Sequence, residues 1–372
     1  MTEHFNRNQY IALISSVFLS PALRLYPKQS VILAGGASFM SPAAAFAVMT
    51  LYLILLCSFL SRRADGEGLA ELTLRALGKY AGGAVLFVSA LWILLYCGLV
   101  VRSSADRFIT TIYPNSSPTV FCVILGLLAL TAALGSTTAL VRTAKLILPA
   151  VFGVLLFALL FSLKSVKTEN LDVQVSSIVP AALGAVPAVN VISSVLVYPA
   201  FLISGMRRDG KSLRAYALWL ALMCAMLSLL SIATVGSFGA DLTARLEHPF
   251  FSMVRNFVIL KSVERIEALV VVLWVFPDFL LASLLIMAAF RCLMCAFGKS
   301  GEFSGQRLFD FSGGRWLIWL CAAAVTVSSL LLAPTAEALS LWSQRIIPTA
   351  NMIYVFALVP AVYAVGRIRE KI

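Results

Sequence analysis

One acidic and one basic side chain lie within long apolar stretches of this sequence. Asp278 directly follows Pro277 in the segment VVLWVFPDFLLASLL, and Arg24 lies in the segment SPALRLYP near the N-terminus. Ionisable groups at the centre of a bilayer are costly and are usually paired or functional. We therefore expect Arg24 to pair with Asp278, which would replace a bound cation and make sodium unnecessary. Alternatively, Asp278 is protonated or faces a water-filled cavity without a partner.

No other arrangement of residues indicates an enzyme, a cofactor or a metal site. The only histidines are His4 and His248, and no Ser/His/Asp or Cys/His arrangement lies within reach of either. Cys292 and Cys295 form a C-x-x-C pair, but a zinc site needs a second pair of ligands. Phosphate-binding loops of the Walker A or G-x-G-x-x-G type do not occur. We expect neither catalysis nor a bound metal.

The composition places these residues in a membrane protein. Of the 372 residues, 60% are hydrophobic and only 12% are charged. Ordinary soluble domains are about 45–50% apolar and about 25% charged. A soluble globular protein and a disordered chain are both excluded. The net charge of +12 is not concentrated in a hydrophilic domain, so we expect a lipid bilayer rather than nucleic acid as the partner.

The apolar stretches are long enough to cross the bilayer as helices, because a spanning helix needs about 20 apolar residues. Ten candidates lie at about 9–36, 41–60, 83–103, 118–136, 145–163, 180–206, 214–238, 266–291, 315–334 and 347–367. A β-barrel would instead show alternating segments of about ten residues. We predict an all-α polytopic membrane protein with one integral membrane domain over residues 1–372.

The ten spans divide into two sets of five, which form repeats at about 9–163 and 180–367. An odd number of spans in each half gives the halves opposite orientations. Inverted repeats of this kind characterise many secondary transporters, whose ligand sites lie at helices broken near the middle of the membrane. This predicts interruptions in the first and sixth spans, which occupy matching places in the two halves.

Both spans carry residues that interrupt helices. The first contains Pro21 and Pro27, and the sixth contains Gly184, Pro187 and Pro199. Proline removes a backbone donor and clashes with the preceding turn. Irregular backbone within a membrane is tolerated where it is buried in protein or lines a wet cavity. We predict that helices one and six are broken; a plain proline kink in each is the alternative.

Basic residues predict the orientation, because cytoplasmic loops carry an excess of lysine and arginine. With the N-terminus inside, most of the 29 basic residues fall on the inner side, including the runs at 61–63 and 207–211. Both termini are then cytoplasmic. Residues 67–80 have the spacing of an amphipathic helix on the cytoplasmic surface. Residues 240–265 form the largest external connection, which is either a packed surface helix or a lid or partner surface.

Several stretches, in this order and spacing, resemble those of a known family. They are SPALRLYP (20–27), AGGASFMSP (34–42), LAELTLRALGKYAGG (69–83), VVRSSADRFITTIYPNSSPTVF (100–121), GSTTALVRTAKLILP (135–149) and HPFFSMVRNFVILKSVERIEALVVVLW (248–274). The chain resembles the spore germination permease family, the B-type membrane subunits of GerA-type germinant receptors. That family belongs to the amino acid/polyamine/organocation superfamily. The resemblance implies a leucine-transporter-like fold in the inner membrane of a bacterial spore, with A-type and C-type receptor subunits as partners.

The resemblance also implies a pocket for a small nutrient, commonly an amino acid. Carried onto this sequence, that pocket falls at Ser20, Pro21 and Ala22 in span one, Tyr96 in span three as an outer closure, Asn190, Ser193 and Ser194 in span six, and Asp278 near its floor. The glycine typical of the first break is replaced by Ser20. Arg24 is therefore a second candidate partner for a ligand carboxylate, in competition with its pairing to Asp278. The serines and the asparagine have the alternative of bonding between helices.

Three functional classes fit these observations. A receptor subunit would change its conformational population on binding a nutrient, and its partners would read that change. A secondary amino-acid transporter, either proton-coupled or a uniporter, would cycle by alternating access. A water or ion conduit opened during germination is the third class. The family resemblance favours the receptor subunit.

Overall fold

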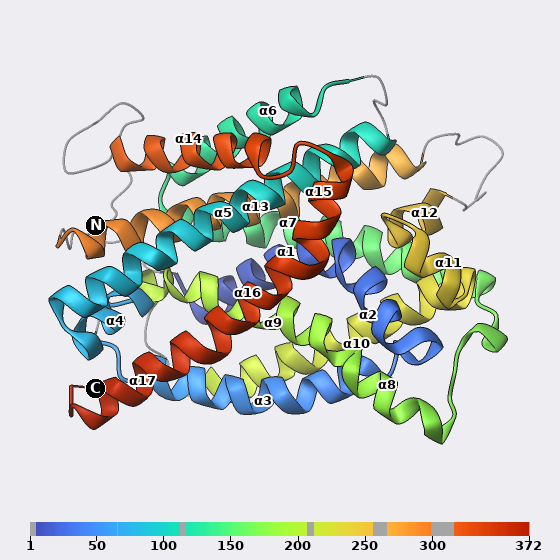
Figure 1. Ribbon diagram of the computed structural model, residues 1–372, viewed down its shortest axis with the longest axis horizontal. Coiled ribbons are helices and arrows are strands. Elements are labelled where there is room, and N and C mark those ends of the chain that lie inside the picture. The colour runs from blue at the N-terminus through green and yellow to red at the C-terminus, as the bar shows by residue number, and fades with distance from the viewer. Residues whose placement is uncertain are drawn as a thin grey trace.

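The computed structural model describes residues 5–64, 66–111, 116–206, 212–255, 266–298 and 316–371. These residues are almost entirely helical (Figure 1). The helices are α1 (Arg7–Arg24), α2 (Tyr26–Ala34), α3 (Ser41–Leu60), α4 (Leu69–Leu77), α5 (Lys79–Thr111), α6 (Pro118–Ala133), α7 (Thr137–Ser162), α8 (Ile178–Leu183), α9 (Ala185–Ala200), α10 (Ser212–Phe238), α11 (Ala240–Arg245), α12 (Pro249–Arg255), α13 (Ile266–Ala296), α14 (Trp316–Leu331), α15 (Ala336–Leu341), α16 (Ile347–Ile353) and α17 (Val359–Ile368). Two π-helical segments, η7 (Trp342–Ile346) and η8 (Tyr354–Leu358), join the last three helices. The predicted all-α architecture is confirmed.

Each predicted span has a helical counterpart, but the helices differ in length. Among the described residues, seven helices are long and apolar enough to cross a membrane, and the number rises to eight when the bent pair α1 and α2 is counted as one span. The counterparts of the fourth and ninth spans, α6 and α14, are shorter apolar helices. The count of ten and the division into two repeats therefore stay predictions. The basic run at 207–211 and the segment 256–265 lie outside the described residues.

The apolar surface of the bundle faces outward, as expected where lipid is the solvent. Leu51 on α3 and Leu146 on α7 are 72% and 81% exposed. The central helix α13 is mostly buried instead: 78% of its apolar stretch within Trp274–Ala296 lies inside the protein. It packs along α5 through the middle of the bundle (Figure 1). Residues on the facing sides of α5 and α13 are therefore shielded from lipid.

The first span is broken, as predicted, but later in the chain than Pro21. Pro21 lies inside α1, and the helix ends at Arg24. The axis then bends by 52° into the second half of the span. Pro27 lies in the first turn of α2, where its missing N–H is tolerated. Arg24 is therefore the last residue before the break, whereas the sequence interpretation placed it just after a break at Pro21.

The sixth span has a milder interruption. Gly184 separates α8 from α9, yet residues Ile178–Ala200 still count as a single apolar span. A side chain at Gly184 would place its Cβ atom 2.6 Å from the Cβ atom of Ala34. Glycine therefore allows the start of α9 to approach the end of α2 closely. Pro199 lies in the last turn of α9 and does not break its centre.

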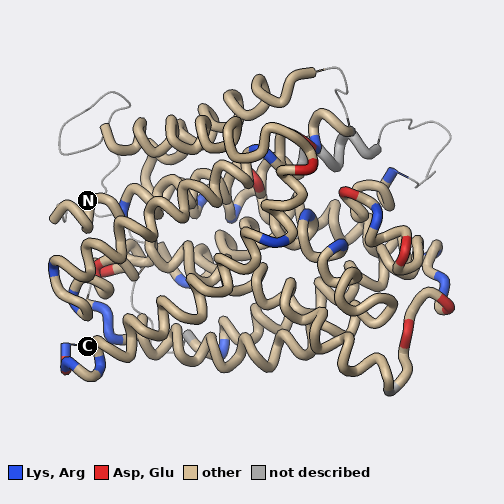
Figure 2. Tube along the Cα trace, in the orientation of Figure 1, with Lys and Arg blue, Asp and Glu red and all other residues tan. Residues whose placement is uncertain are grey.

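At the end of the bundle that carries both termini, short polar contacts hold the helices together. Arg63 donates to the carbonyl oxygens of Ile203 and Met206 at 2.6 and 3.0 Å. The amphipathic segment predicted at 67–80 forms α4, and its Glu71 contacts Arg291 of α13 at 2.7 Å. Figure 2 shows charged residues near this terminal end and near the opposite end, and a further group between them inside the bundle.

Candidate functional site

A buried carboxylate connects three helices at the centre of the candidate site. Asp278 of α13 is 4% exposed and accepts hydrogen bonds at 2.5 Å from Ser20 of α1 and Ser104 of α5. Arg107 of α5 forms an ion pair with the same carboxylate. These partners satisfy both oxygens of Asp278 and fix α1, α5 and α13 relative to one another.

The predicted pair of Arg24 and Asp278 is wrong, because Arg107 takes the place expected for Arg24. Arg107 reaches Asp278 because α5 packs along α13 and stays helical to Thr111. The predicted third span ends near 103, so the sequence places Arg107 beyond it and does not predict a contact with Asp278. The expectation that a guanidinium neutralises Asp278 holds with a different arginine.

Arg24 is buried at 5% exposure, and its side chain lies near Tyr96, Arg107 and Asp278. Tyr96 is close enough to interact, but within the part of the chain that the structure describes none of the three guanidinium nitrogens of Arg24 has a partner with hydrogen-bond geometry. Two buried guanidinium groups thus share one carboxylate. A buried charge without compensation is strongly unfavourable, so this arrangement favours a further anion beside Arg24.

Arg24 also lines a pocket that lies away from the terminal end. The pocket has a volume of about 550 Å³ including its open mouth. Its lining comes from the break in span one, α5, the segment before α12, and α15 with η7: Arg24, Leu25, Lys28, Gln29, Ser103, Asp106, Glu247, His248, Ala336, Leu339, Ser340, Ser343 and Gln344. Gln29 donates to the carbonyl oxygen of Ser343 at 2.8 Å, which ties α2 to the π-helical segment. π-Helical turns occur frequently at functional sites.

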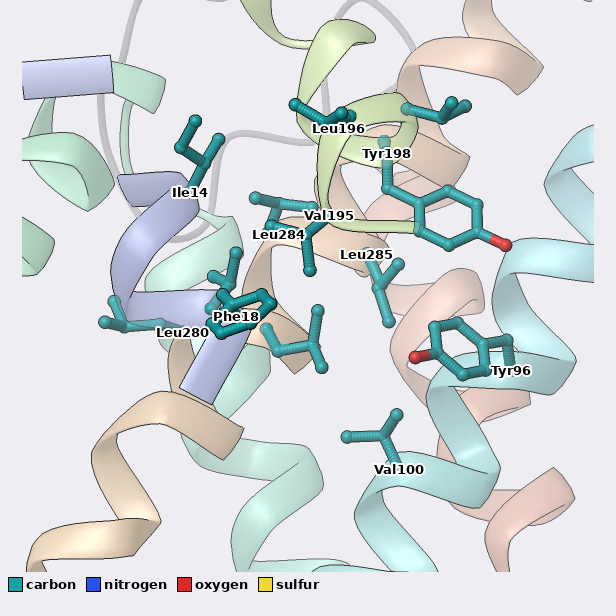
Figure 3. Close-up of a cluster of buried hydrophobic side chains, with 14 of the residues drawn as sticks. Ile14, Phe18, Tyr96, Val100, Val195, Leu196, Tyr198, Leu280, Leu284 and Leu285 are labelled. Atoms are coloured by element: carbon teal, nitrogen blue, oxygen red, sulfur yellow. The ribbon is translucent and has the colours of Figure 1, made fainter. Parts of the chain in front are cut away.

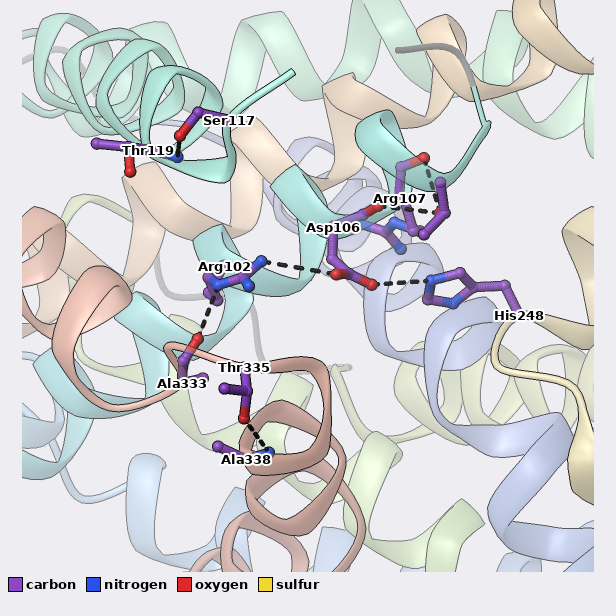
Figure 4. Close-up of polar contacts among 10 residues, drawn as sticks. Arg102, Asp106, Arg107, Ser117, Thr119, His248, Ala333, Thr335 and Ala338 are labelled. Atoms are coloured by element: carbon purple, nitrogen blue, oxygen red, sulfur yellow. Dashed lines mark hydrogen bonds and ion pairs between the residues drawn. The ribbon is translucent and has the colours of Figure 1, made fainter. Parts of the chain in front are cut away.

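Asp106 lines one side of this pocket. Its carboxylate makes two long ionic contacts, one on each side (Figure 4). Its carboxylate lies 3.6 Å from the Arg102 guanidinium and 3.7 Å from Nε2 of His248. Arg102 also donates to the carbonyl oxygen of Ala333 at 2.9 Å, in the connection between α14 and α15. Burial lowers the pKa of His248, although the neighbouring Asp106 acts in the opposite direction. His248 is therefore uncharged near neutral pH.

Asp106, Glu247 and His248 also have the geometry to approach one metal ion. One ligand atom from each lies within 4.8 Å of the others. The positive charges of Arg102, at 3.6 Å from Asp106, and of nearby Arg107 oppose a cation there. This repulsion is half as large for a singly charged ammonium group as for a divalent metal ion. Three ligand atoms are also fewer than the roughly six or more that Ca²⁺ or Mg²⁺ takes.

Of the residues predicted to bind ligand, Arg24 alone lines this pocket. Ser20 is occupied by Asp278, and Pro21 and Ala22 are buried within α1. In α9, the Ser193 hydroxyl bonds back to the carbonyl of Asn190 at 3.2 Å, and the Ser194 hydroxyl bonds back to that of Val191 at 2.8 Å. The side-chain oxygen of Asn190 is buried without a partner.

Tyr96 lies in an aromatic layer rather than at the pocket mouth. Its ring centroid is 5.5 Å from that of Tyr198 (Figure 3). Tyr198 stacks in turn on Tyr354 at 6.0 Å. The Tyr198 hydroxyl donates to Asn351, and Trp92 donates to the Tyr198 oxygen at 3.0 Å. Tyr96 precedes Ser103 on α5, so this layer lies on the terminal side of the pocket.

Sequence reasoning missed Lys28, Asp106, His248 and Gln344 as pocket residues. Asp106 and His248 do lie in stretches that carry the family resemblance, at 100–121 and 248–274. Nothing in the sequence indicates that these two stretches meet, because only the packing of α5 against the segment before α12 brings them together. Residues 264 and 265 of the second stretch lie outside the described residues.

Comparisons with known proteins agree with this architecture. A family model described as "Spore germination protein" matches residues 45–337. No curated protein matches the chain in sequence. Among solved structures, Mhp1, a nucleobase-cation-symport-1 family transporter in a closed conformation with bromovinylhydantoin bound, is similar over 98% of this chain and 78% of its own, with 12% identity and a TM-score of 0.60. MhsT in complex with L-phenylalanine is similar over 97% of this chain and 98% of its own, with 14% identity and a TM-score of 0.54. The chain therefore has the leucine-transporter-like fold.

Proposed function

Since the chain belongs to the spore germination protein family, we propose that it is the membrane subunit of a germinant receptor that binds a small nutrient carrying a carboxylate. An amino acid is the nutrient that fits best. We propose the inner membrane of the spore as its location and A-type and C-type receptor subunits as its partners. Nutrient binding would shift the conformational population of this subunit, and the partners would respond to that shift.

The unpaired guanidinium of Arg24 is the observation that carries this proposal. It is buried at the break in span one and lines the pocket. A ligand carboxylate can accept two parallel hydrogen bonds from one guanidinium, which gives both orientation and affinity. The ligand would also balance the second positive charge beside Asp278. MhsT, which has the same fold, is known with L-phenylalanine bound, and this supports an amino acid as the ligand class.

The direction of access follows from the predicted orientation. If both termini are cytoplasmic, the pocket lies toward the external side, because α2 and α15, which line it, lie away from the end of the bundle that carries the termini (Figure 1). The buried aromatic layer of Tyr96, Tyr198 and Tyr354 then separates it from the inner side. A nutrient arriving from outside the spore membrane would reach Arg24 without passing this layer.

A secondary amino-acid transporter, proton-coupled or a uniporter, is the alternative, and it is favoured by the transporter fold. Proteoliposomes containing the purified protein distinguish the two functions when they are supplied with a labelled mixture of L-amino acids. Saturable uptake supports a carrier. Absence of uptake by protein that the same amino acids stabilise against heating supports a sensor, because a ligand that binds only the folded state raises its stability.

The binding step itself is tested with Arg24→Gln and, as a matched control, Arg345→Gln. Arg345 lies in a neighbouring exposed hollow and not in the pocket. We expect L-amino acids to raise the melting temperature of the wild type and of Arg345→Gln, but not of Arg24→Gln. Equal stabilisation of all three proteins would contradict the role of Arg24.

A further inference from the structure

Asp106 offers a second charged contact within the pocket that contains Arg24. Its carboxylate lines the pocket from α5. Its contacts with Arg102 and His248, at 3.6 and 3.7 Å, are longer than the 2.7–2.9 Å of a charge-assisted hydrogen bond. Since His248 is uncharged near neutral pH, only one of these contacts is a full ion pair. The carboxylate therefore has room for a stronger donor.

We propose that Asp106 binds the ammonium group of a zwitterionic ligand whose carboxylate contacts Arg24, and that this ammonium displaces Arg102 and His248 from Asp106. The inference rests on the proposed function and adds to it the orientation of the ligand and the first change that binding causes. The unpaired, buried guanidinium of Arg24 in the same pocket is the independent sign that a charged ligand enters there.

The depths of the two residues set the orientation of the ligand. Arg24 is 5% exposed and lies at the break in span one, whereas the Asp106 side chain is 16% exposed. The carboxylate of the ligand therefore lies deeper and its ammonium group lies closer to the mouth. Glu247 is the other acidic residue of the pocket, but it is exposed, and water weakens its attraction for a cation.

Displacement of the two partners would change the surface around the pocket. Arg102 connects Asp106 to the carbonyl oxygen of Ala333, just before α15, and α15 lines the pocket. His248 lies directly before α12, where its ring packs edge-on against Phe251 at 6.2 Å. Loss of the contact between Asp106 and His248 would remove one link between α5 and the start of α12, while the Arg107 guanidinium stays over the Phe251 ring at 5.7 Å from its centroid. Arg102 lies on α5 with Asp106 and would keep its bond to the carbonyl oxygen of Ala333. Binding would thereby loosen the start of α12 at the end of the bundle away from the termini.

The test compares L-alanine with propionate, which has the same carboxylate and carbon chain but no ammonium group. Apparent affinities are measured from the ligand-dependent melting temperature of the full chain, for the wild type, Asp106→Asn and the control Glu247→Gln. An ammonium hydrogen-bonded to a carboxylate favours L-alanine over propionate by about tenfold or more. We expect this preference in the wild type and in Glu247→Gln. In Asp106→Asn, L-alanine should bind no better than propionate, and propionate should bind at least as well as it binds the wild type.

The outcomes separate this inference from the proposed function. Stabilisation of the wild type by neither compound contradicts both. Equal binding of the two compounds to the wild type, or an unchanged preference in Asp106→Asn, overturns the role of Asp106 and leaves that of Arg24 intact. Loss of the preference in Glu247→Gln assigns the ammonium to Glu247 and also overturns the inference.

The displacement is tested with His248→Gln and with Arg102→Gln. Removal of a competing partner should raise the affinity for L-alanine and leave that for propionate unchanged. Unchanged L-alanine affinity in both variants would show that no exchange occurs at Asp106. A lower affinity for L-alanine in His248→Gln would show that the histidine supports the binding site, which also contradicts the exchange.

Discussion

Arg107 on α5 forms an ion pair with Asp278 on α13, and both side chains are 4% exposed. Ser20 and Ser104 supply the remaining donors to the carboxylate. The charge of Asp278 is thus compensated within the chain, and a hydrogen bond from Ser20 ties α1 to α13. Arg24, one turn after Ser20, has no hydrogen-bond partner among the described residues and is the residue that we propose to bind the ligand carboxylate.

Substitution Asp278→Asn should destabilise the protein strongly. The change leaves Arg107 buried without its counter-charge, and removal of one partner of a buried pair typically costs about 3–5 kcal/mol. The double variant Asp278→Asn/Arg107→Gln removes both charges and should be more stable than the single variant. Thermal melting of the purified protein in detergent measures both effects. Additive losses in the double variant would contradict a direct pairing.

Arg24→Gln should behave in the opposite way when no ligand is present. Because the guanidinium is buried without a hydrogen-bond partner, its removal relieves an uncompensated charge. The ligand-free variant should melt at the same temperature as the wild type or higher. A large drop in melting temperature would show that Arg24 has a structural partner after all.

The stability of the protein should decrease in mild acid, partly through His248. Burial lowers the pKa of His248 below its ordinary value of 6.5. In the interval below 6.5 and above the lowered value, the unfolded chain binds a proton at this residue and the folded protein does not, so stability falls as the pH decreases through it. His248→Gln should lose less stability than the wild type between about pH 7 and pH 5. Identical pH profiles of melting temperature would contradict this assignment.

The helices and the first break could be predicted because their causes are local. Apolar length reveals a spanning helix, and the two prolines in the first span predict an interruption of it. The exact position was missed because Pro21 is tolerated within α1. The apolar pattern also predicts an end of the third span that is too early, near residue 103. A charged residue just beyond an apolar stretch is typical of the membrane interface, and the sequence does not show that Arg107 has a buried partner in Asp278.

The pocket could not be assembled from the sequence, because its walls come from distant segments. Asp106, His248 and Ser343 meet only when α5, the residues before α12 and η7 are packed together. For the hydroxyls of Ser193 and Ser194, the sequence instead predicts a ligand contact where the structure shows a bond within the helix. Their position in a proline-rich span suggested ligand contacts, but each bonds to a carbonyl three residues earlier in its own helix.

Two ion pairs near the terminal end should contribute very differently to stability. Glu71 and Arg291 are 19% and 15% exposed and lie 2.7 Å apart, and Glu71 also accepts a hydrogen bond from the backbone N–H of Gly68. Glu71→Gln should therefore destabilise the protein by about 1–3 kcal/mol. Glu67→Gln is the control, because Glu67 likewise accepts a hydrogen bond from a backbone N–H, that of Ala64, but its ion pair with Arg75 is more exposed and such pairs contribute about 0–1 kcal/mol. Equal melting temperatures of the two variants would show that Glu71 does not hold α4 against α13.

The close approach at Gly184 is the last feature that a substitution can test. An alanine there would bring its Cβ atom to 2.6 Å from that of Ala34, a contact that short, rigid side chains cannot relieve. Overpacking of this kind typically costs about 1–3 kcal/mol, so Gly184→Ala should lower the melting temperature. Gly153 in α7 is the matched control, since a Cβ atom there meets nothing within 4 Å. Gly153→Ala should leave stability unchanged or raise it, because alanine favours the helix. If Gly184→Ala melted at the temperature of Gly153→Ala, the junction of α8 and α9 would not be held against α2, and the packing of the sixth span against the first would have to be loose.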